Sequence, residues 1–124
     1  MATVTNYREV HVNQNVTLEI LAGETVSGAL DCAGTTLCAI RADEQLSEAT
    51  LNFLVTNDTT VPAALLYNTA DSLLISVVVP TLGAGEAAWI QIPPAVFAGL
   101  RYFAVVSDVA PAQNSTLYCA VRPV

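Results

Sequence analysis

The sequence contains no lysine, and four arginines face eleven aspartates and glutamates, giving a formal net charge of −7. Sequence-independent binding of nucleic acid needs a cluster of cations that displaces counterions from the phosphates, and docking to an anionic membrane also relies on cations. No segment approaches the roughly 20 apolar residues that span a bilayer. We therefore expect neither nucleic acid nor a membrane as a partner.

Histidine and cysteine are also scarce. His11 is the only histidine, and Cys32, Cys38 and Cys119 contain no Cys-x-x-Cys pair, so we expect no metal site and no cofactor. Cys119 lies in an alternating apolar pattern and is interpreted as a small buried hydrophobe. Cys32 and Cys38 flank a turn and could face each other. The N-terminus lacks a basic stretch followed by an apolar one, which predicts a product made in the cytoplasm, where thiols stay reduced.

The residues for catalysis are missing as well. A hydrolytic triad needs a base held by an acid beside a nucleophile, but no serine or cysteine has a nucleophile-elbow context. Asp43, Glu44 and Asp71 lie in predicted loops where oxygen ligands could hold calcium, but no Asp-x-Asp-x-Asp loop is present. We interpret them as solvated turn acids. The sequence thus predicts no catalytic residues and a protein that is not an enzyme.

Charged residues make up only 12% of the chain, whereas hydrophobic residues make up 53%. Soluble domains usually contain about 25% charged residues. Large exposed apolar patches usually mark interfaces, so we expect part of this apolar surface to be buried against partners, in a homodimer, homotrimer or larger assembly. The alternative is a dense β-core under a surface rich in alanine and valine.

The strongest periodic signal lies in residues 49–79. Three strand-like runs are separated by short polar breaks, and Leu51, Phe53 and Val55 alternate with more polar residues. Strands joined by short turns pair antiparallel, so this stretch predicts an antiparallel meander whose third strand is the apolar run 73–79. The whole chain predicts about eight to ten short strands. We expect residues 16–124 to form a single-domain, all-β antiparallel sandwich of jelly-roll-like type, preceded by an N-terminal arm or edge strand over residues 1–15.

Smaller features add local expectations. Residues 42–48 and 95–99 are each expected to form at most one helical turn. Strict alternation in the strand 36–41 places Leu37 on the face opposite Ile40. The strand 87–92 should place Trp89 and Gln91 on the face opposite Ile90 and Ile92, and it should end at a pair of prolines, since proline cannot donate to a ladder.

Several short motifs also follow one another in an informative order. They are Val26–Asp31, Leu37–Ile40, Ala49–Phe53, Ala64–Asn68, Ile92–Tyr102 and Leu117–Val124. This order resembles a family of small virion proteins of tailed bacteriophages. The sequence departs from the family at Cys32 and Cys38, where aliphatic residues are usual, at Ile92-Pro93-Pro94, where an acidic-Pro pair is common, and at Asp58-Thr59, where the family has an Asp-Gly hairpin.

The resemblance implies a β-sandwich with a structural role in the virion and without catalytic residues. Its members would decorate or cement the head shell by binding the major capsid protein or another virion protein; a head spike, tail or fibre base is the alternative. A function of another class also stays open, because Trp89 and three tyrosines (Tyr67, Tyr102 and Tyr118) could form the platform of a carbohydrate-binding module. We favour a core or interface role for these aromatics. The candidate interface residues are Tyr7, Arg8, Val10, Val12, Trp89, Arg101, Tyr118 and Arg122.

Overall fold

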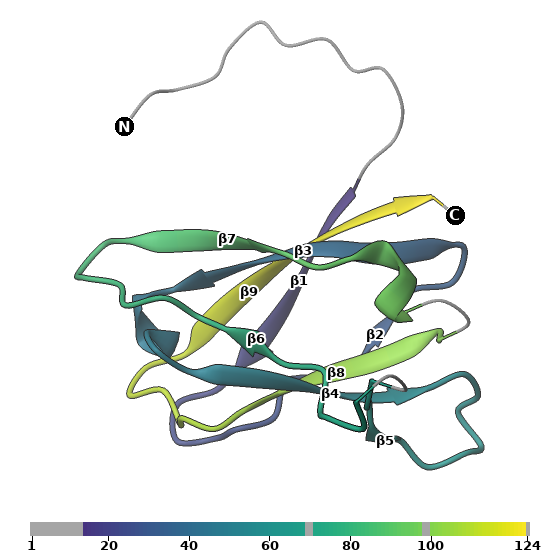
Figure 1. Cartoon of the computed structure of the whole chain (residues 1–124). Helices are drawn as coiled ribbons and strands as arrows, with labels where there is room; N and C mark the ends of the chain where they lie inside the picture. Colours follow the sequence, from purple (N-terminus) through teal and green to yellow (C-terminus); the bar gives the residue numbers. More distant parts are fainter. Residues whose placement is uncertain (1–13, 69–70, 98–99, 124) are drawn as a thin grey trace, which may run out of the picture.

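Two antiparallel β-sheets pack face to face in the computed structural model, which describes residues 14–68, 71–97 and 100–123 (Figure 1). The predicted all-β sandwich is confirmed. Inward apolar side chains alternate with outward polar ones, as a strand buried on one face requires. The elements are β1 (Gln14–Ile20), β2 (Leu30–Asp31), β3 (Thr35–Asp43), the 3₁₀ turn η1 (Glu44–Leu46), β4 (Thr50–Thr56), β5 (Ala64–Leu65), β6 (Val77–Val78), β7 (Ala87–Gln91), the 3₁₀ turn η2 (Pro94–Phe97), β8 (Tyr102–Ser107) and β9 (Ser115–Pro123).

The strand order is that of a jelly roll. Sheet A has the order β1-β9-β3-β7, and sheet B has the order β2-β8-β4-β5, with β6 also paired to β4. The pairs are nested, since β1 pairs with β9, β2 with β8, β3 with β7 and β4 with β5. A chain paired in this way is a long hairpin rolled over on itself, and the pairings of β3 with β9 and of β4 with β8 close the two sheets.

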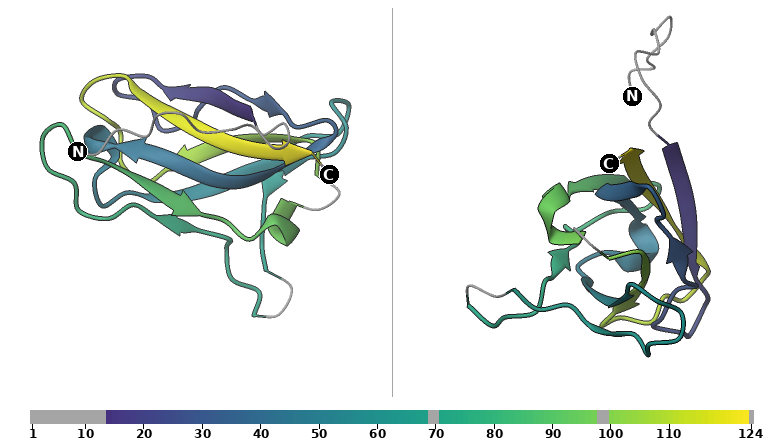
Figure 2. Two further views of the ribbon diagram at one scale, coloured as in Figure 1. Left: turned by 90° about the horizontal axis from the view of Figure 1, so that it is seen from above. Right: turned by 90° about the vertical axis from the view of Figure 1, so that its right-hand side faces the viewer.

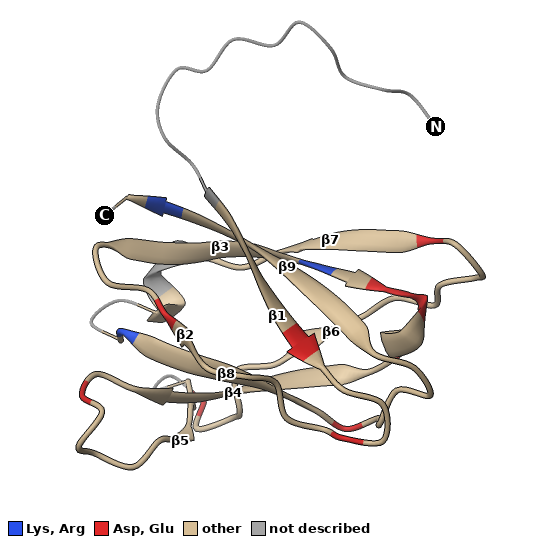
Figure 3. Cartoon of the chain, turned by 180° about the vertical axis from the view of Figure 1, so that it is seen from behind, with Lys and Arg blue, Asp and Glu red and all other residues tan. Residues whose placement is uncertain are grey.

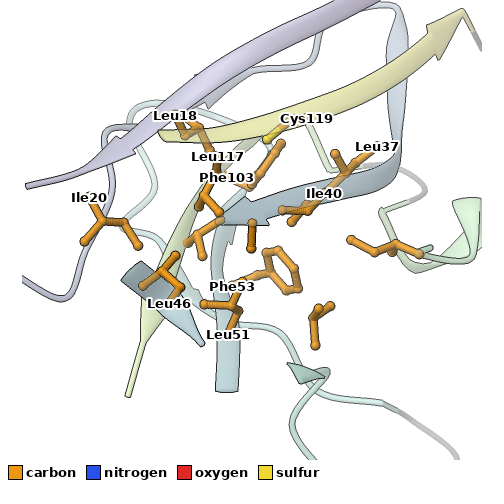
Figure 4. Packing of buried hydrophobic residues seen from close by; sticks show 14 of the residues in the cluster. Leu18, Ile20, Leu37, Ile40, Leu46, Leu51, Phe53, Phe103, Leu117 and Cys119 are labelled. Carbon is orange, nitrogen blue, oxygen red and sulfur yellow. The ribbon is translucent and has the colours of Figure 1, made fainter. Parts of the chain in front are cut away.

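The core lies between the two sheets and includes Phe53 and Phe103 (Figure 4), with Phe97 as a third phenylalanine. The Phe53 ring contacts Phe97 edge-on, with centroids 5.0 Å apart, and meets Phe103 at 6.2 Å. Leu117 and Cys119, on β9 of the opposite sheet, are fully buried in the same core. Aromatic edge-to-face pairs add to the free energy gained from burying apolar area.

Strand β3 departs from the predicted alternation. Its register against β9 shifts between Leu37 and Ala39, so an extra residue, Cys38, is accommodated there. A bulge of this kind turns the following side chains to the other face. Leu37 therefore lies in the core together with Ile40 and Ala42, and the expectation that Leu37 faces away from Ile40 is wrong.

The predicted meander is correct for its first two strands and wrong for its third. Both β5 and β6 pair with the same edge of β4, because β8 occupies the other edge. Between them the chain leaves the sheet as a hairpin, with a bridge between Tyr67 and Leu74 and a 3.0 Å hydrogen bond from the Ile75 amide to the Leu66 carbonyl. This hairpin projects from the body of the molecule (Figure 2). Its outward path leaves only Val77–Val78 of the predicted third strand in the sheet.

The turns follow their local chemistry. Both expected helical turns occur, as η1 and η2. The Asp43 side chain accepts a hydrogen bond from the Gln45 amide at 3.0 Å and so caps η1. Gly34, with φ of 72°, forms the turn between β2 and β3, in a conformation that glycine adopts at little cost. Within the described ranges, no helix is long and apolar enough to cross a membrane.

Candidate binding surface

The acidic side chains serve the turns and do not converge on one point. No group of three His, Cys, Asp or Glu residues suited to a metal ion occurs among the described residues. Asp43 accepts hydrogen bonds from the η1 backbone and from the Ser115 hydroxyl, the latter at 2.8 Å, and Glu44 accepts one from the Gly85 amide at 2.8 Å. The Asp71 carboxylate accepts from the Leu73 amide at 3.0 Å. By accepting these hydrogen bonds, the loop acids stabilise the turns in which they lie. His11 lies outside the described residues.

Large apolar side chains are exposed along one segment of sheet B. Tyr67 is 53% exposed, Leu73 63% and Val78 65%, and all belong to the segment that runs along the edge of β4 opposite β8. We call the five exposed apolar residues of this segment the apolar edge: Val61, Leu65, Tyr67, Leu73 and Val78. Five of the ten exposed large hydrophobic residues of the described chain thus lie within 18 positions of the sequence, 61–78. This concentration is typical of a docking surface.

A second feature crosses the outer face of sheet A. Arg41 on β3 is the register partner of Trp89 on β7 and of Tyr118 on β9. The Arg41 guanidinium lies over the Tyr118 ring, with its carbon 5.3 Å from the ring centroid. Trp89 is 52% exposed and Tyr118 40% exposed. We call these three side chains the Trp89–Arg41–Tyr118 row.

The row lies on the outer face because its strand neighbours point inward. Ile40, Leu117 and Cys119 are fully buried, and Ile90 packs against the same core. Seen from the side of β1 and β9, most of the ribbon is uncharged, and acidic positions lie mainly in loops and at strand ends (Figure 3).

The other predicted interface residues lie elsewhere. Arg101 pairs with Asp31 and stacks over the Tyr102 ring, with its guanidinium carbon 4.9 Å from the centroid, at the start of β8. Arg122 is exposed near the end of β9, where it pairs in register with Thr36. Trp89 and Tyr118 are brought together with Arg41, which was not among the predicted interface residues. Tyr7, Arg8, Val10 and Val12 lie outside the described residues.

The proposed four-ring sugar platform is not assembled as such. Tyr67 lies on the hairpin beside sheet B, and Tyr102 lies on β8 under Arg101, whereas Trp89 and Tyr118 share sheet A. Sequence reasoning also missed the exposure of Leu73 and Val78, because an apolar run interrupted only at Ser76 is typical of a buried strand. No local signal in that run distinguishes the exposed side chains from the buried ones.

The three cysteines are all free. Cys32 and Cys119 are buried, and Cys38 is half-buried at the β3 bulge, where its thiol donates to the Thr36 carbonyl at an Sγ–O distance of 3.6 Å. Burial raises the pKa of the Cys32 thiol and raises that of Cys119 to about 12. The packing interpretation of Cys119 is confirmed.

Comparison with known proteins gives little to set beside this geometry. No family model matches the chain, and no curated protein matches it. The fold is similar to a chain in a solved structure of Bacillus endospore appendages, described there as a novel family of disulfide-linked pili. The TM-score is 0.45 at 11% sequence identity, and the match covers 100% of this chain and 96% of that chain. A similarity this low assigns neither a family nor a function.

Proposed function

We propose that the protein is a non-enzymatic structural protein of a tailed-bacteriophage virion, a decoration or cement protein that stabilises the head shell as an oligomer. The proposal starts from the order of motifs that resembles small phage virion proteins. The observation that carries it furthest is the apolar edge, because exposed apolar side chains concentrated on one segment are typical of a surface that another protein covers.

The composition supports the same proposal. A chain with 12% charged residues and no lysine has few groups to keep a lone domain soluble, and burial in an assembly removes that disadvantage. Jelly rolls are also found in viral capsid domains. This last point is an analogy at the level of the fold, and a fold alone does not define a function.

The apolar edge is the part of the surface proposed to contact the shell. Tyr67 and Leu73 flank the tip of the projecting hairpin and can reach a neighbouring subunit without any change in the sandwich. The N-terminal segment, polar in sequence, is proposed as a second attachment point that hooks a neighbour. A head-spike, tail or fibre-base position would use the same surfaces at another place on the particle.

Immunogold labelling of whole particles tests the location. Label spread over the head supports decoration or cement, label at one vertex or on the tail supports the spike, tail or fibre-base alternative, and unlabelled particles contradict a virion role.

Binding of purified protein to undecorated heads tests the surface. Leu73→Asp should abolish binding because it introduces a charge into an apolar contact, whereas Val109→Asp, at an exposed apolar residue outside the apolar edge, should bind as the wild type does. Binding should persist in high salt, because apolar contacts are not screened. Deletion of residues 1–12 should weaken attachment and leave the sandwich folded. Equal binding by Leu73→Asp and Val109→Asp would rule out the apolar edge.

A further inference from the structure

The Trp89–Arg41–Tyr118 row has the form of a recognition strip that runs across the strands. Neighbouring strands lie about 4.8 Å apart, so the backbones that carry Trp89 and Tyr118 are about 10 Å apart with the strand of Arg41 between them. Both rings are fixed on sheet strands and need little reorganisation to receive a ligand. This strip is distinct from the apolar edge, which belongs to sheet B.

The side chains beside the Trp89–Arg41–Tyr118 row are short. In the next register row, Ala39 pairs with Ala120, and the row ends at the exposed residues Asn15 and Gln91. Because the alanines extend only one carbon from the backbone, the rings of Trp89 and Tyr118 stand above this side of the sheet. A flat ligand can therefore lie on the rings and reach amide groups at both ends of the neighbouring row.

Arg41 differs from Arg101 in having no carboxylate partner among the described residues. Arg101 forms a two-bond pair with Asp31, whereas the Tyr118 ring is the one partner found for the Arg41 guanidinium within the described chain. A planar guanidinium presents five N–H donors in a fixed fork that matches a carboxylate. The row thus offers an unused anion-binding fork between two exposed aromatic rings.

We propose that this row binds a saccharide that carries a carboxylate group, such as a uronic acid or a sialic acid. The apolar face of a sugar ring stacks on Trp89, and the carboxylate accepts the two parallel N–H bonds of Arg41, whose guanidinium rests on the Tyr118 ring. Gln91 and Asn15 supply donors and acceptors for hydroxyl groups. The ligand carries isolated carboxylates, since the net charge of −7 repels dense polyanions such as nucleic acids.

A protein partner suits this face less well. Protein interfaces have an apolar centre, but the residues beside the row are alanines, threonines and amides on one side and include the acids Asp43 and Glu19 on the other, and most exposed aliphatic side chains lie at the apolar edge. The saccharide proposal does not depend on a virion role, so each can fail without the other.

Titration with a panel of oligosaccharides that carry isolated carboxylates tests the proposal: hyaluronan oligomers, an oligosaccharide with a single terminal uronic acid and a sialylated glycan. Trp89 is the only tryptophan, so a ligand stacked on it should change the intrinsic fluorescence. Isothermal titration calorimetry measures the dissociation constants of the wild type and the variants. We expect Trp89→Ala and Arg41→Gln each to weaken binding at least about tenfold, in line with the loss of a charge-assisted or stacking contact.

Two matched controls sharpen the test. Tyr67→Ala removes an equally exposed ring outside the row and should leave the affinity unchanged. The carboxyl-reduced form of the bound glycan keeps the sugar rings but loses the charge, so it should bind at least about tenfold more weakly to the wild type and about equally to wild type and Arg41→Gln.

Three results would overturn the proposal: no binding to any member of the panel, equal binding of the carboxylated and reduced glycans, or unchanged binding by Trp89→Ala. If the panel fails and Trp89→Ala dissociates an oligomer in analytical ultracentrifugation, the row is an interface between copies of this chain.

Discussion

Asp31 and Arg101 form a two-bond ion pair, with an Nε–Oδ1 distance of 2.8 Å and an Nη2–Oδ2 distance of 3.0 Å. The two residues are 70 positions apart in the sequence, and the pair joins the short strand β2 to the start of β8. Tyr102, the register partner of Asp31, lies under the same guanidinium. The ion pair therefore adds a side-chain contact to a strand pair that has only two residues in register and that is continued by a 2.7 Å hydrogen bond from the Cys32 amide to the Arg101 carbonyl.

This pair predicts an acid-sensitive contribution to stability. The side-chain hydrogen bond from Arg101, followed by the Ala33 amide, lowers the pKa of Asp31 below its usual value. A carboxylate whose pKa is lower in the folded state stabilises that state above its unfolded pKa of about 3.9, and the contribution is lost as the pH falls through the folded pKa. We expect the melting temperature of the wild type to fall in this acid range more steeply than that of Asp31→Asn.

The effect should be modest, because both side chains are about half exposed and solvent screens the pair. Arg101→Gln should reduce the same pH dependence, and adding Asp31→Asn to it should change little more. If the pH profiles of Asp31→Asn and wild type coincide, the pair does not contribute in solution.

The phenylalanine cluster predicts where the core is most sensitive. Phe53→Ala removes a fully buried ring that contacts Phe97 and Phe103, and it should lower the free energy of unfolding by about 3–5 kcal/mol, from lost burial and the cavity left behind. Urea denaturation followed by circular dichroism measures this change. Leu73→Ala, at an exposed position, should stay within about 0.5 kcal/mol of the wild type. Equal losses from both changes would contradict the assigned core.

The different burial of the cysteines predicts the order in which their thiols react with a labelling reagent. Cys38 is half-buried, whereas Cys119 is fully buried and burial raises its pKa to about 12, so the thiolate of Cys119 is scarce at any ordinary pH. With a thiol-specific disulfide reagent at mildly alkaline pH, Cys38 should react first, and Cys119 only on unfolding. Cys38→Ser should abolish the fast phase. A fast phase that survives in Cys38→Ser would place another thiol at the surface.

Much of the fold was predictable because its strands are half buried. Leu51 and Phe53 alternate with more polar neighbours, and both are fully buried on β4. The same rule correctly placed Trp89 on the face opposite Ile90 and Ile92, which pack in the core. Local alternation reports one buried face, and that is enough to predict a sandwich.

The candidate surface could not be predicted in the same way, because it depends on pairing between distant segments. Arg41 meets Trp89 and Tyr118 only through the β3–β7 and β3–β9 registers, and the β3 bulge at Cys38 shifts one of them. The exposure of side chains in residues 73–79 was hard to predict for a related reason. An apolar run without alternation does not reveal which side chains a neighbouring strand will cover, so the exposure of Leu73 depended on the hairpin.

The segment just before β2 contains a side-chain hydrogen bond to β8 whose loss should lower the free energy of unfolding. At Ser27 the ladder to β8 is continued by a side chain: the Ser27 hydroxyl accepts a hydrogen bond from the Val105 amide at 2.9 Å and donates to the Gly28 carbonyl at 2.8 Å. Ser27→Ala leaves the buried Val105 amide without this partner, which should cost about 1–3 kcal/mol of unfolding free energy. Ser76→Ala removes an exposed hydroxyl bonded to Asn52 and should cost less than about 1 kcal/mol. Hydrogen exchange gives the local readout, because the Val105 amide should exchange faster in Ser27→Ala alone. If its protection is unchanged, β8 has another acceptor for this amide and the hydroxyl is not required.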